Sequence, residues 1–257
     1  MKNVQILTSD AYDYIQTIKD ESIDLVILDP QYNDWDRIVN DGWFLQTALD
    51  KLKPTGNLLC FTKQPFDLHL RIELEEPGVF RREIIWCFDN GGAWVSNRMP
   101  LVSHQKIYWC TKTKDFFFQP RTGVAYKEIT KNCHRANKVF EGYKKEGKDF
   151  EMSKDGVWLR DHLFFKKPLA GKIAAKPRGL MEILIRCFCP AEGSVCDPFM
   201  GSGIVPIICV ETQRECFSCD IDEDRVKAAF NKVTAEFAKA VGFSWEEEKR
   251  NDEQRSN

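Results

Sequence analysis

The chain has 257 residues, of which 43% are apolar and 30% are charged, a composition ordinary for a soluble globular protein. This length can form one domain with an insertion, or two small domains, with a buried core. No apolar run approaches the roughly 20 residues that a membrane-spanning helix needs, and the first residues lack the apolar stretch of a signal peptide. We therefore predict a cytoplasmic protein that does not enter a membrane.

Strands and helices alternate over the first 110 or so residues. Runs rich in β-branched residues predict strands, and apolar residues at helical spacing predict helices. The run Ile23–Leu28 has the character of a strand buried on both faces, whereas Lys53–Gly56 contains Pro and Gly and predicts a turn. The predicted strands are Val4–Leu7, Ile23–Leu28, Asn57–Thr62, Arg82–Phe88 and Lys106–Cys110, and the predicted helices are Ala11–Ile18, Trp43–Leu52 and Phe66–Glu75.

The alternation breaks at Arg121 and resumes at Pro177. Between Lys127 and Lys167 the sequence mixes lysine, glycine and aromatic residues without a clear period, which indicates a small subdomain of short elements. Alternation on both sides of the break predicts an α/β fold, with a mostly parallel sheet and helices on both faces. The later predicted helices are Gly179–Cys189, Ile204–Thr212 and Glu223–Ala240, and the later predicted strands are Val195–Cys196 and Cys216–Cys219.

The net charge of −2 is unevenly distributed along the chain. From Arg121 to Arg178 there are 15 lysines and arginines against 7 aspartates and glutamates, a net charge of +8 that leaves −10 for the remainder. A localised basic segment suits contact with a polyanion such as DNA. A solvated lysine-rich insertion has the same composition, so charge alone does not decide between the two.

Ten cysteines raise the question of disulfides or a metal site. The chain is too long, and too rich in ordinary core residues, for a small disulfide scaffold. Cys216 and Cys219 have the spacing of a zinc knuckle, but residues three apart on a strand point to opposite faces. Cys187 and Cys189 have no histidine nearby in the sequence. We therefore expect buried, reduced thiols and no metal.

A glycine-rich loop, Asp197–Gly203, follows a predicted strand. Gly201 and Gly203 allow a tight turn and a close approach of ligand to backbone before Ile204 opens a helix. The loop lacks the lysine of a phosphate-binding loop, so an uncharged nucleoside or an amino-acid tail fits it better. Asp220, at the end of the next strand, can accept hydrogen bonds from both ribose hydroxyls. An ordinary strand–helix turn with an incidental acid is the alternative.

A second loop, Asp29-Pro30-Gln31-Tyr32, follows the strand Ile23–Leu28. The exocyclic amine of a base is a weak nucleophile, because its lone pair is delocalised into the ring. The Asp29 carboxylate and the Pro30 carbonyl can accept its two hydrogens and aim the lone pair at a sulfonium methyl, while Tyr32 stacks on the flipped base. Alignment and electrostatics would then supply the acceleration without a covalent nucleophile. Taken alone, the tetrapeptide is more typical of an ordinary turn.

Together the two loops resemble the signature loops of S-adenosylmethionine-dependent amino-methyltransferases that act on DNA. The catalytic loop comes first, as in the permuted β class of that family. The segments Asp10–Asn33, Lys176-Pro177 and Asp220–Glu223 resemble further parts of it, and the resemblance covers most of Met1–Arg121 and Lys172–Val233. It implies a circularly permuted, Rossmann-like methyltransferase fold with a small inserted target-recognition region, with S-adenosylmethionine as cofactor.

The resemblance also divides the chain and assigns roles to residues. It implies a catalytic half at 1–120, a basic target-recognition insertion at 121–171, a cofactor-binding half at 172–240 and a charged tail at 241–257. Asp10 matches an acid near the cofactor's adenine amine, Lys176 lies in the segment near its methionine end, and Asp220 matches the ribose contact. The catalytic-loop matches are Asp29, Pro30 and Tyr32, and the cofactor-loop matches are Asp197, Phe199, Gly201, Ser202 and Gly203.

Three departures from the family pattern mark a divergent member. Gln31 replaces a second proline, Ile204 replaces a threonine, and Ala174-Ala175 stand where His-Pro is common. None of them removes a group that the chemistry requires.

The main hypothesis is a site-specific DNA (adenine-N6) methyltransferase, because Asp at the first catalytic position favours adenine in this class. A cytosine-N4 enzyme on the same scaffold and a non-catalytic DNA-binding homologue are the alternatives. RNA or protein amide methylation is disfavoured, because such family members usually carry Asn at that position and place the cofactor loop first.

Several basic residues are candidates for contact with double-stranded DNA. Lysines act as point charges that position the backbone without specifying sequence, and the chosen candidates are Lys144, Lys145, Lys166 and Lys167. For His134 and His162, phosphate contact and plain solvent exposure are equal alternatives, and His104 is predicted to be a packed or hydrogen-bonded strand residue. Whether the chain forms a homodimer or works with a cognate restriction endonuclease is left open by the sequence.

Overall fold

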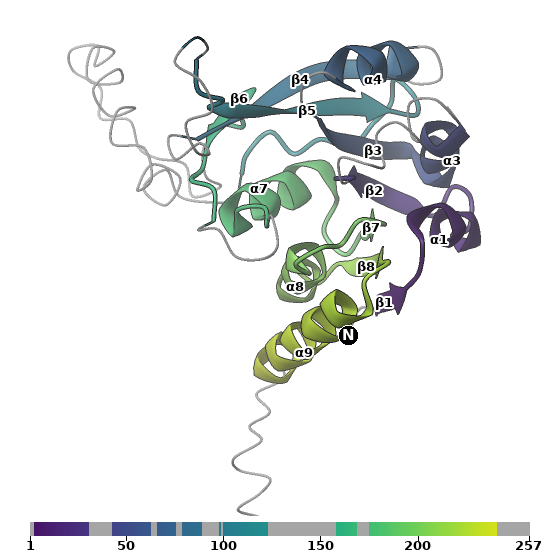
Figure 1. Ribbon diagram of the computed structural model, residues 1–257. Helices are drawn as coiled ribbons and strands as arrows, with labels where there is room; N and C mark the ends of the chain where they lie inside the picture. Colours follow the sequence, from purple (N-terminus) through teal and green to yellow (C-terminus); the bar gives the residue numbers. More distant parts are fainter. Residues whose placement is uncertain are drawn as a thin grey trace, which may run out of the picture.

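An eight-stranded sheet runs through the centre of the protein, as the computed structural model shows (Figure 1). The structure describes residues 3–30, 43–62, 66–75, 79–88, 98, 100–122, 158–168 and 175–240. The strands are β1 (Val4–Thr8), β2 (Ile23–Leu28), β3 (Leu52–Thr62), β4 (Val79–Cys87), β5 (His104–Thr111), β6 (His162–Phe164), β7 (Ser194–Asp197) and β8 (Glu215–Asp220). The helices are α1 (Ala11–Thr17), α3 (Trp43–Lys51), α4 (Phe66–Glu75), α7 (Arg178–Phe188), α8 (Ile204–Glu211) and α9 (Glu223–Ala240).

The strand order is β1-β8-β7-β2-β3-β5-β4-β6. The five strands from β1 to β3 in this order are parallel to their neighbours, whereas β5 is antiparallel to both β3 and β4. The predicted α/β class with a mostly parallel sheet is therefore confirmed.

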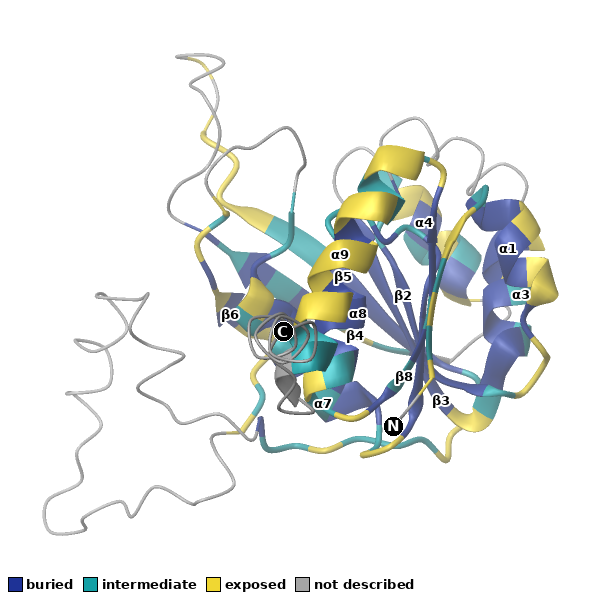
Figure 2. Ribbon diagram, turned by 90° about the horizontal axis from the view of Figure 1, so that it is seen from below, coloured by how far each residue is buried: buried dark blue, intermediate teal, exposed yellow. Residues whose placement is uncertain are grey.

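Helices cover both faces of the sheet, and the core lies in two layers between helices and strands (Figure 2). Helices α7, α8 and α9 cover one face, and α1, α3 and α4 cover the other. Strand β2 explains this arrangement, since all six of its residues are buried. Leu25 and Ile27 belong to the cluster beneath α7 and α8, whereas Val26 and Leu28 belong to the cluster beneath α1 and α3. A central parallel strand needs such apolar residues on both faces.

Most predicted elements match the observed ones to within one to three residues at each end, but the predicted turn at Lys53–Gly56 is wrong. These four residues lie inside β3. The pairing of β3 with β2 jumps there, from Leu52 opposite Ile23 to Asn57 opposite Leu25, so the segment forms a bulge rather than a chain reversal. The Thr55 carbonyl accepts a hydrogen bond of 2.9 Å from the Phe117 backbone, a partner that local sequence does not reveal.

The amino ends of β2 and β7 are fastened together by a buried carboxylate. Asp24 is 7% exposed, and its Oδ2 accepts hydrogen bonds from the Ser194 backbone at 2.8 Å and from Lys53 Nζ at 2.7 Å. The Ser194 hydroxyl, 3.0 Å from the same oxygen, also reaches the Ser22 carbonyl at 2.9 Å. This network holds neighbouring strands in register at the edge opposite the two loops.

The described end of the basic segment is part of the sheet. Strand β6 pairs in parallel with β4, and the Trp86 indole donates a hydrogen bond of 2.8 Å to the Phe165 carbonyl. Gly179, in α7, packs so closely on the Phe165 ring that a Cβ there would lie 2.9 Å from it. The region predicted to recognise DNA is thus joined to the helix that follows Lys176-Pro177.

The cysteines of β8 lie on opposite faces of the sheet, as predicted. Cys216 belongs to the cluster beneath α7 and α8, and Cys219 to the cluster beneath α1 and α3. Burial raises the pKa of the Cys187 and Cys189 thiols to about 12, so both stay protonated near neutral pH. Among the described residues, no helix has the length and apolar character to cross a membrane.

Candidate active site

Four aspartates meet where the parallel strands end. Asp10 follows β1, Asp29 follows β2, Asp197 ends β7 and Asp220 ends β8, so the parallel arrangement gathers them at one edge. The Ser9 backbone donates to the Asp220 carbonyl at 3.1 Å, which ties two of these strand ends together. Ligands of open α/β sheets bind beyond this edge. The predicted catalytic and cofactor loops therefore begin at the same place.

The glycines of the loop Asp197–Gly203 have different roles. Both adopt left-handed backbone, with φ of 53° at Gly201 and 76° at Gly203. A Cβ at Gly203 would lie 2.6 Å from the Cβ of Ala229 on α9, so this glycine lets α8 and α9 pack. A Cβ at Gly201 would meet only the Phe199 carbonyl, at 3.8 Å, among the described atoms. Gly201 therefore faces open space that can receive a ligand.

Asp220 holds the cofactor loop in place. Its Oδ2 accepts a hydrogen bond of 2.8 Å from the Gly201 backbone, and its Oδ1 accepts one of 2.9 Å from Asp222. The predicted ribose contact would therefore use the remaining lone pairs of these oxygens. Ile221 comes next and is 71% exposed. Ile221 is not among the predicted site residues, and its exposed apolar side chain next to Asp220 is a feature that the sequence alone does not reveal.

Asp197 forms the buried floor of the site. Its side chain is 3% exposed, and its Oδ1 accepts a hydrogen bond of 3.2 Å from the Phe199 backbone. Burial and, to a lesser extent, the nearby negative charge of Asp29 together raise the pKa of Asp197 to about 8. Asp197 is therefore mostly protonated at neutral pH. Phe199 packs on Phe44, with ring centroids 5.8 Å apart, so the loop is anchored in the core.

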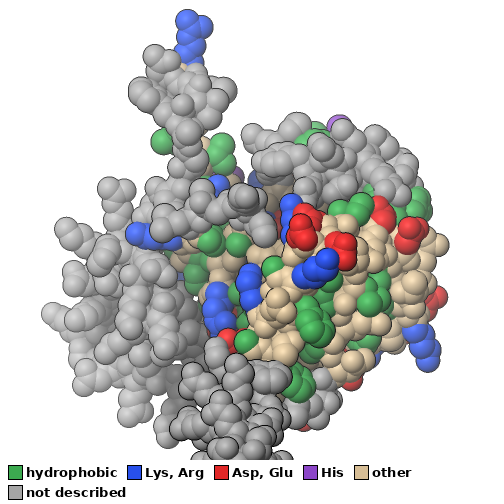
Figure 3. Space-filling view, turned by 60° about the horizontal axis from the view of Figure 1, so that its bottom comes forward, with side chains coloured by type: hydrophobic (Ala, Val, Ile, Leu, Met, Phe, Trp, Pro, Cys, Tyr) green, Lys and Arg blue, Asp and Glu red, His purple; other side chains and the backbone are tan. Residues whose placement is uncertain are grey.

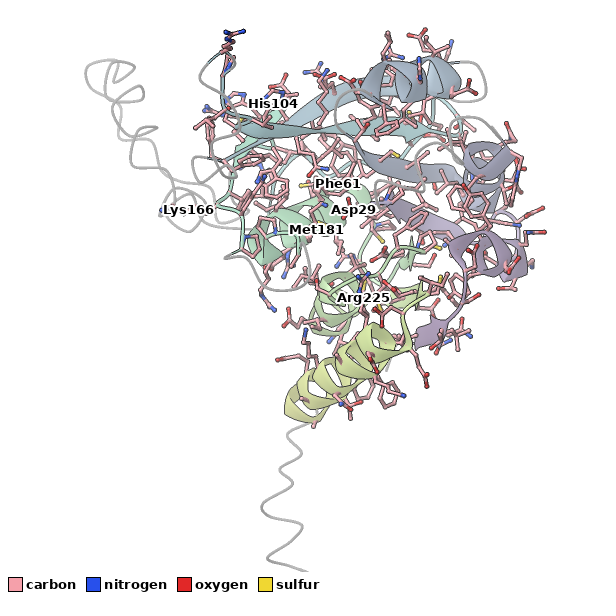
Figure 4. All side chains as sticks on the ribbon, in the orientation of Figure 1. Asp29, Phe61, His104, Lys166, Met181 and Arg225 are labelled. Atoms are coloured by element: carbon pink, nitrogen blue, oxygen red, sulfur yellow. The ribbon has the colours of Figure 1, made fainter. Side chains whose placement is uncertain are left out.

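Asp29 forms an ion pair with Lys176. The Lys176 ammonium donates a hydrogen bond to Oδ2 of Asp29, although 147 positions separate the two residues. The same ammonium lies 4.8 Å from the ring centroid of Phe61, which Figure 4 shows beside Asp29 in the middle of the molecule. Within the described part of the chain, no hydrogen bond to Oδ1 of Asp29 is present. The sequence does not predict this pairing, since the resemblance implies that Lys176 lies near the methionine end of the cofactor.

Residues 23–231 match the sequence profile of the N6/N4 methyltransferase family, described as DNA methylase. The chain belongs to this family of DNA methylases. The predicted resemblance and its methyltransferase chemistry are confirmed, and S-adenosylmethionine is the family's cofactor. In this DNA methylase β2 with Asp29 precedes β7 with the loop Asp197–Gly203, which is the order that the resemblance to the permuted class predicts.

Curated relatives and solved structures support the same placement. The DNA methylase is 27% identical over 243 residues to the type II methyltransferase M1.MboII of Moraxella bovis, covering 85% of this chain and 92% of the relative. It is 24% identical over 249 residues to M.HpaI of Haemophilus parainfluenzae, covering 91% and 75%.

Two solved structures share the fold. M1.HpyAVI in complex with SAM has a TM-score of 0.65 at 20% identity, covering 90% of this chain and 98% of that one. The cytosine-N4-specific PvuII DNA methyltransferase has a TM-score of 0.65 at 16% identity, covering 95% and 94%.

The remaining predicted loop residues have the following positions in the methylase. Pro30 is buried directly after Asp29, whereas Gln31 and Tyr32 lie outside the described residues. Asp10 caps α1 through a hydrogen bond of 2.8 Å from the Tyr12 backbone to its Oδ1. The Ser202 carbonyl accepts a hydrogen bond of 3.2 Å from Lys232 on α9. Their roles toward a cofactor or a base stay predictions.

The predicted DNA-contacting lysines are only partly described. Lys166 is exposed, whereas Lys167 is half-buried with its ammonium 3.8 Å from the Phe88 ring centroid. Burial and, to a lesser extent, the positive charge of Lys176 lower the pKa of Lys167. Lys144 and Lys145 lie outside the described residues.

Two of the described histidines, His104 and His162, were considered in the sequence. His104 lies in a strand, as predicted, since it opens β5 opposite Cys87 of β4, but its side chain is exposed rather than packed. His162 is exposed too, and its Nδ1 lies 3.3 Å from Asp161. On the face in Figure 3, the described lysine and arginine side chains lie among acidic and hydrophobic ones.

Proposed function

We propose that this DNA methylase transfers a methyl group from S-adenosylmethionine to the N6 amine of a flipped adenine within a specific sequence of double-stranded DNA. The observation that carries the proposal is the placement of Asp29. This carboxylate stands at the carboxyl end of the sheet, beside the cofactor loop, with its side chain 27% exposed and with no hydrogen bond to Oδ1 from any described residue. An acceptor in that position is what an exocyclic amine needs.

The residues present fit the cofactor. Gly201 leaves room for a ligand against the backbone, and Ile221 offers an exposed apolar face for a purine. Asp220 retains lone pairs for ribose hydroxyls, and Asp10 stands near the same edge for the adenine amine. Carboxylates also suit a ligand with an ammonium and a sulfonium charge. These features support a nucleoside site bounded by β1, β7 and β8.

The chemistry then requires little beyond alignment. S-adenosylmethionine, when bound, would supply a sulfonium methyl group: the N–CH3 bond would form as the CH3–S bond breaks to leave a neutral thioether, and the proton lost by the amine nitrogen would pass through the Asp29 carboxylate to solvent. Asp29 Oδ1 and the Pro30 carbonyl would accept the two amine hydrogens and turn the lone pair out of the ring plane. Tyr32 would stack on the flipped base. Exclusion of water from the site by the bound base would strengthen these hydrogen bonds.

The basic segment would hold the DNA backbone. Lys166 and Lys167 lie at its described end, and Lys144 and Lys145 belong to its central part. Phosphate contacts of this kind position the duplex and weaken as salt rises. In this proposal the enzyme is cytoplasmic, and a second copy of the chain or a cognate restriction endonuclease would be its protein partner.

The decisive experiment identifies the methylated base. Purified protein is incubated with labelled S-adenosylmethionine and mixed-sequence duplex DNA, and the product is hydrolysed to nucleosides. Wild type should yield N6-methyladenine and Asp29→Ala should yield none, whereas Asp13→Ala, which removes an exposed carboxylate of α1, should match wild type.

Other products would separate the alternatives. N4-methylcytosine would favour the second candidate, which the likeness to the cytosine-N4-specific PvuII enzyme supports. Product from Asp29→Ala at the wild-type rate would exclude the proposed catalytic loop. Binding of cofactor and DNA with no transfer to duplexes that cover all short target sequences would indicate a non-catalytic homologue.

A further inference from the structure

The ammonium of Lys176 is held in one place by two different groups. One is the carboxylate of Asp29 and the other is the face of Phe61, which is fully buried at the end of β3. The Lys176 side chain is 13% exposed, so its position is fixed by packing rather than by solvent. A cation near an aromatic face and a carboxylate is stabilised by both.

We propose that Lys176 is a positioning residue for methyl transfer: it binds Oδ2 of Asp29 and thereby turns Oδ1 toward the amine of the target base. This inference rests on the proposed function, because it concerns the same carboxylate. It differs from the expectation that Lys176 contacts the methionine end of the cofactor. Asp29 directly follows β2, and Lys176 lies in the segment before α7. Two separate parts of the chain therefore form the ion pair.

The charges around the pair agree with this role. Asp29 lies close enough to the buried Asp197 to raise the pKa of that carboxyl group, and Lys176 acts on Asp197 in the opposite direction. Lys176 therefore offsets the negative charge of Asp29, which lies near the mostly protonated Asp197. Without Lys176, Oδ2 of Asp29 would lose the hydrogen bond that the lysine donates to it.

The test measures the rate of the chemical step separately from binding. We compare wild type, Lys176→Met and Lys176→Arg in single-turnover methylation of DNA, and measure S-adenosylmethionine binding by calorimetry. Lys176→Met should slow the single turnover by about 100-fold, the cost of misplacing a reacting group, while the Kd for S-adenosylmethionine changes less than about threefold. Lys176→Arg keeps the charge and should recover most of the rate.

A double variant tests whether the lysine acts through Asp29. In the Asp29→Ala background, Lys176→Met should cause no further loss of rate, because its target is already absent. The matched control is Lys51→Met, which removes a lysine that is 10% exposed and paired with Asp20 at 2.6 Å, at the amino end of β3 and so at the edge of the sheet opposite the candidate site. It should lower stability without changing the rate of the folded protein. If Lys176→Met fails to fold, the comparison of Lys176→Arg with wild type, and of the double variant with Asp29→Ala, carries the test.

Three results would overturn the inference. A loss of S-adenosylmethionine affinity as large as the loss of rate would return Lys176 to the cofactor. A faster single turnover by Lys176→Met would mean that the ammonium occupies the place of the substrate amine. A further loss of rate in the double variant would show an action independent of Asp29. If wild type transfers no methyl group to DNA, the proposed function itself fails before any variant is compared, and this inference fails with it.

Discussion

Asp24 lies within β2, and Asp29 directly follows this strand. Both carboxylates are paired with lysines, yet their surroundings differ. Asp24 accepts a hydrogen bond from the backbone of a neighbouring strand as well as from Lys53, and it is 7% exposed. Asp29 forms an ion pair with Lys176, which lies far away in the sequence. The Asp29 side chain is 27% exposed, at the edge of the sheet where the parallel strands end. The difference separates a carboxylate that fastens strands from one that remains available to a ligand.

This comparison shows why residue type alone does not identify a site. Both acids lie near the end of a buried apolar strand, and both have a basic partner. What distinguishes them is which end of the parallel strand they occupy, since ligands bind at the carboxyl ends. A carboxylate at the amino end that bonds backbone stabilises the fold, and one at the carboxyl end can take part in chemistry.

Replacing Asp29 should give the largest effect. We expect Asp29→Ala to lower the rate of methyl transfer by about 1000-fold, the upper range for removing one oriented hydrogen-bonding group from an active site. Its stability should stay within about 1 kcal/mol of wild type, because a partly exposed ion pair contributes little. Single-turnover kinetics and urea unfolding of the same preparation measure both quantities. A large loss of stability would place Asp29 in the same structural class as Asp24.

Replacing Asp24 should give the reverse pattern. Asp24→Ala leaves the buried Ser194 backbone N–H and hydroxyl without their acceptor, at a cost of about 1–3 kcal/mol for each unsatisfied group, whereas Lys53 is 40% exposed and can turn to water. We expect a correspondingly lower urea midpoint, with a rate per folded molecule equal to that of wild type. Activity measured well below the unfolding transition checks the second part. A slow but fully stable variant would contradict the assignment of Asp24 to the fold.

Much of the fold follows from the sequence, because the strands and helices have clear apolar patterns. Ile23–Leu28 was predicted as a doubly buried strand, and all six residues are buried. Phe66–Glu75 and Glu223–Ala240 were predicted with the observed bounds. Parallel topology then brings Asp29 and the cofactor loop to one edge. Local pattern and sheet geometry were sufficient for these features.

The missed features depend on contacts between distant residues. The bulge at Lys53–Gly56 is held by Phe117, about 60 residues later, whereas Pro and Gly locally favour a turn. Strand β6 is three residues long and exists because it pairs with β4. The ion pair of Lys176 with Asp29 spans 147 positions. The spacing of apolar residues predicts helices and strands, but it does not predict contacts between residues that are far apart in the sequence.

The buried acid of the site should make stability depend on pH in a particular direction. The pKa of Asp197 is about 8 in the folded protein, above its ordinary value of 3.8, so between these values the folded state binds more protons than the unfolded state. This contribution to stability is fully present below about pH 4 and is lost as pH rises toward 8. Between pH 5 and 8 the loss is roughly 3 kcal/mol.

Asp197→Asn tests this expectation, because an amide can keep the hydrogen bond from Phe199 without a charge. Relative to wild type, the variant should gain stability as pH rises from 5 to 8. Urea unfolding of both proteins at several pH values measures the difference. A constant difference across this range would mean that Asp197 keeps one protonation state throughout.

The two glycines of the cofactor loop, Gly201 and Gly203, differ in the same way as Asp29 and Asp24: one faces the candidate ligand site and the other serves the packing of the fold. Gly203→Ala should cost about 2 kcal/mol of stability, because the left-handed backbone disfavours alanine and the new methyl meets Ala229. Gly201→Ala has a similar backbone cost of about 1 kcal/mol, but its methyl enters open space on the ligand side. We therefore expect about tenfold weaker binding of S-adenosylmethionine from Gly201→Ala, equivalent to about 1.4 kcal/mol. Calorimetric titration and urea unfolding of both variants separate the two effects. Equal cofactor affinities in the two variants would mean that the space beside Gly201 is not the cofactor site, and that both glycines, like Asp24, serve the fold.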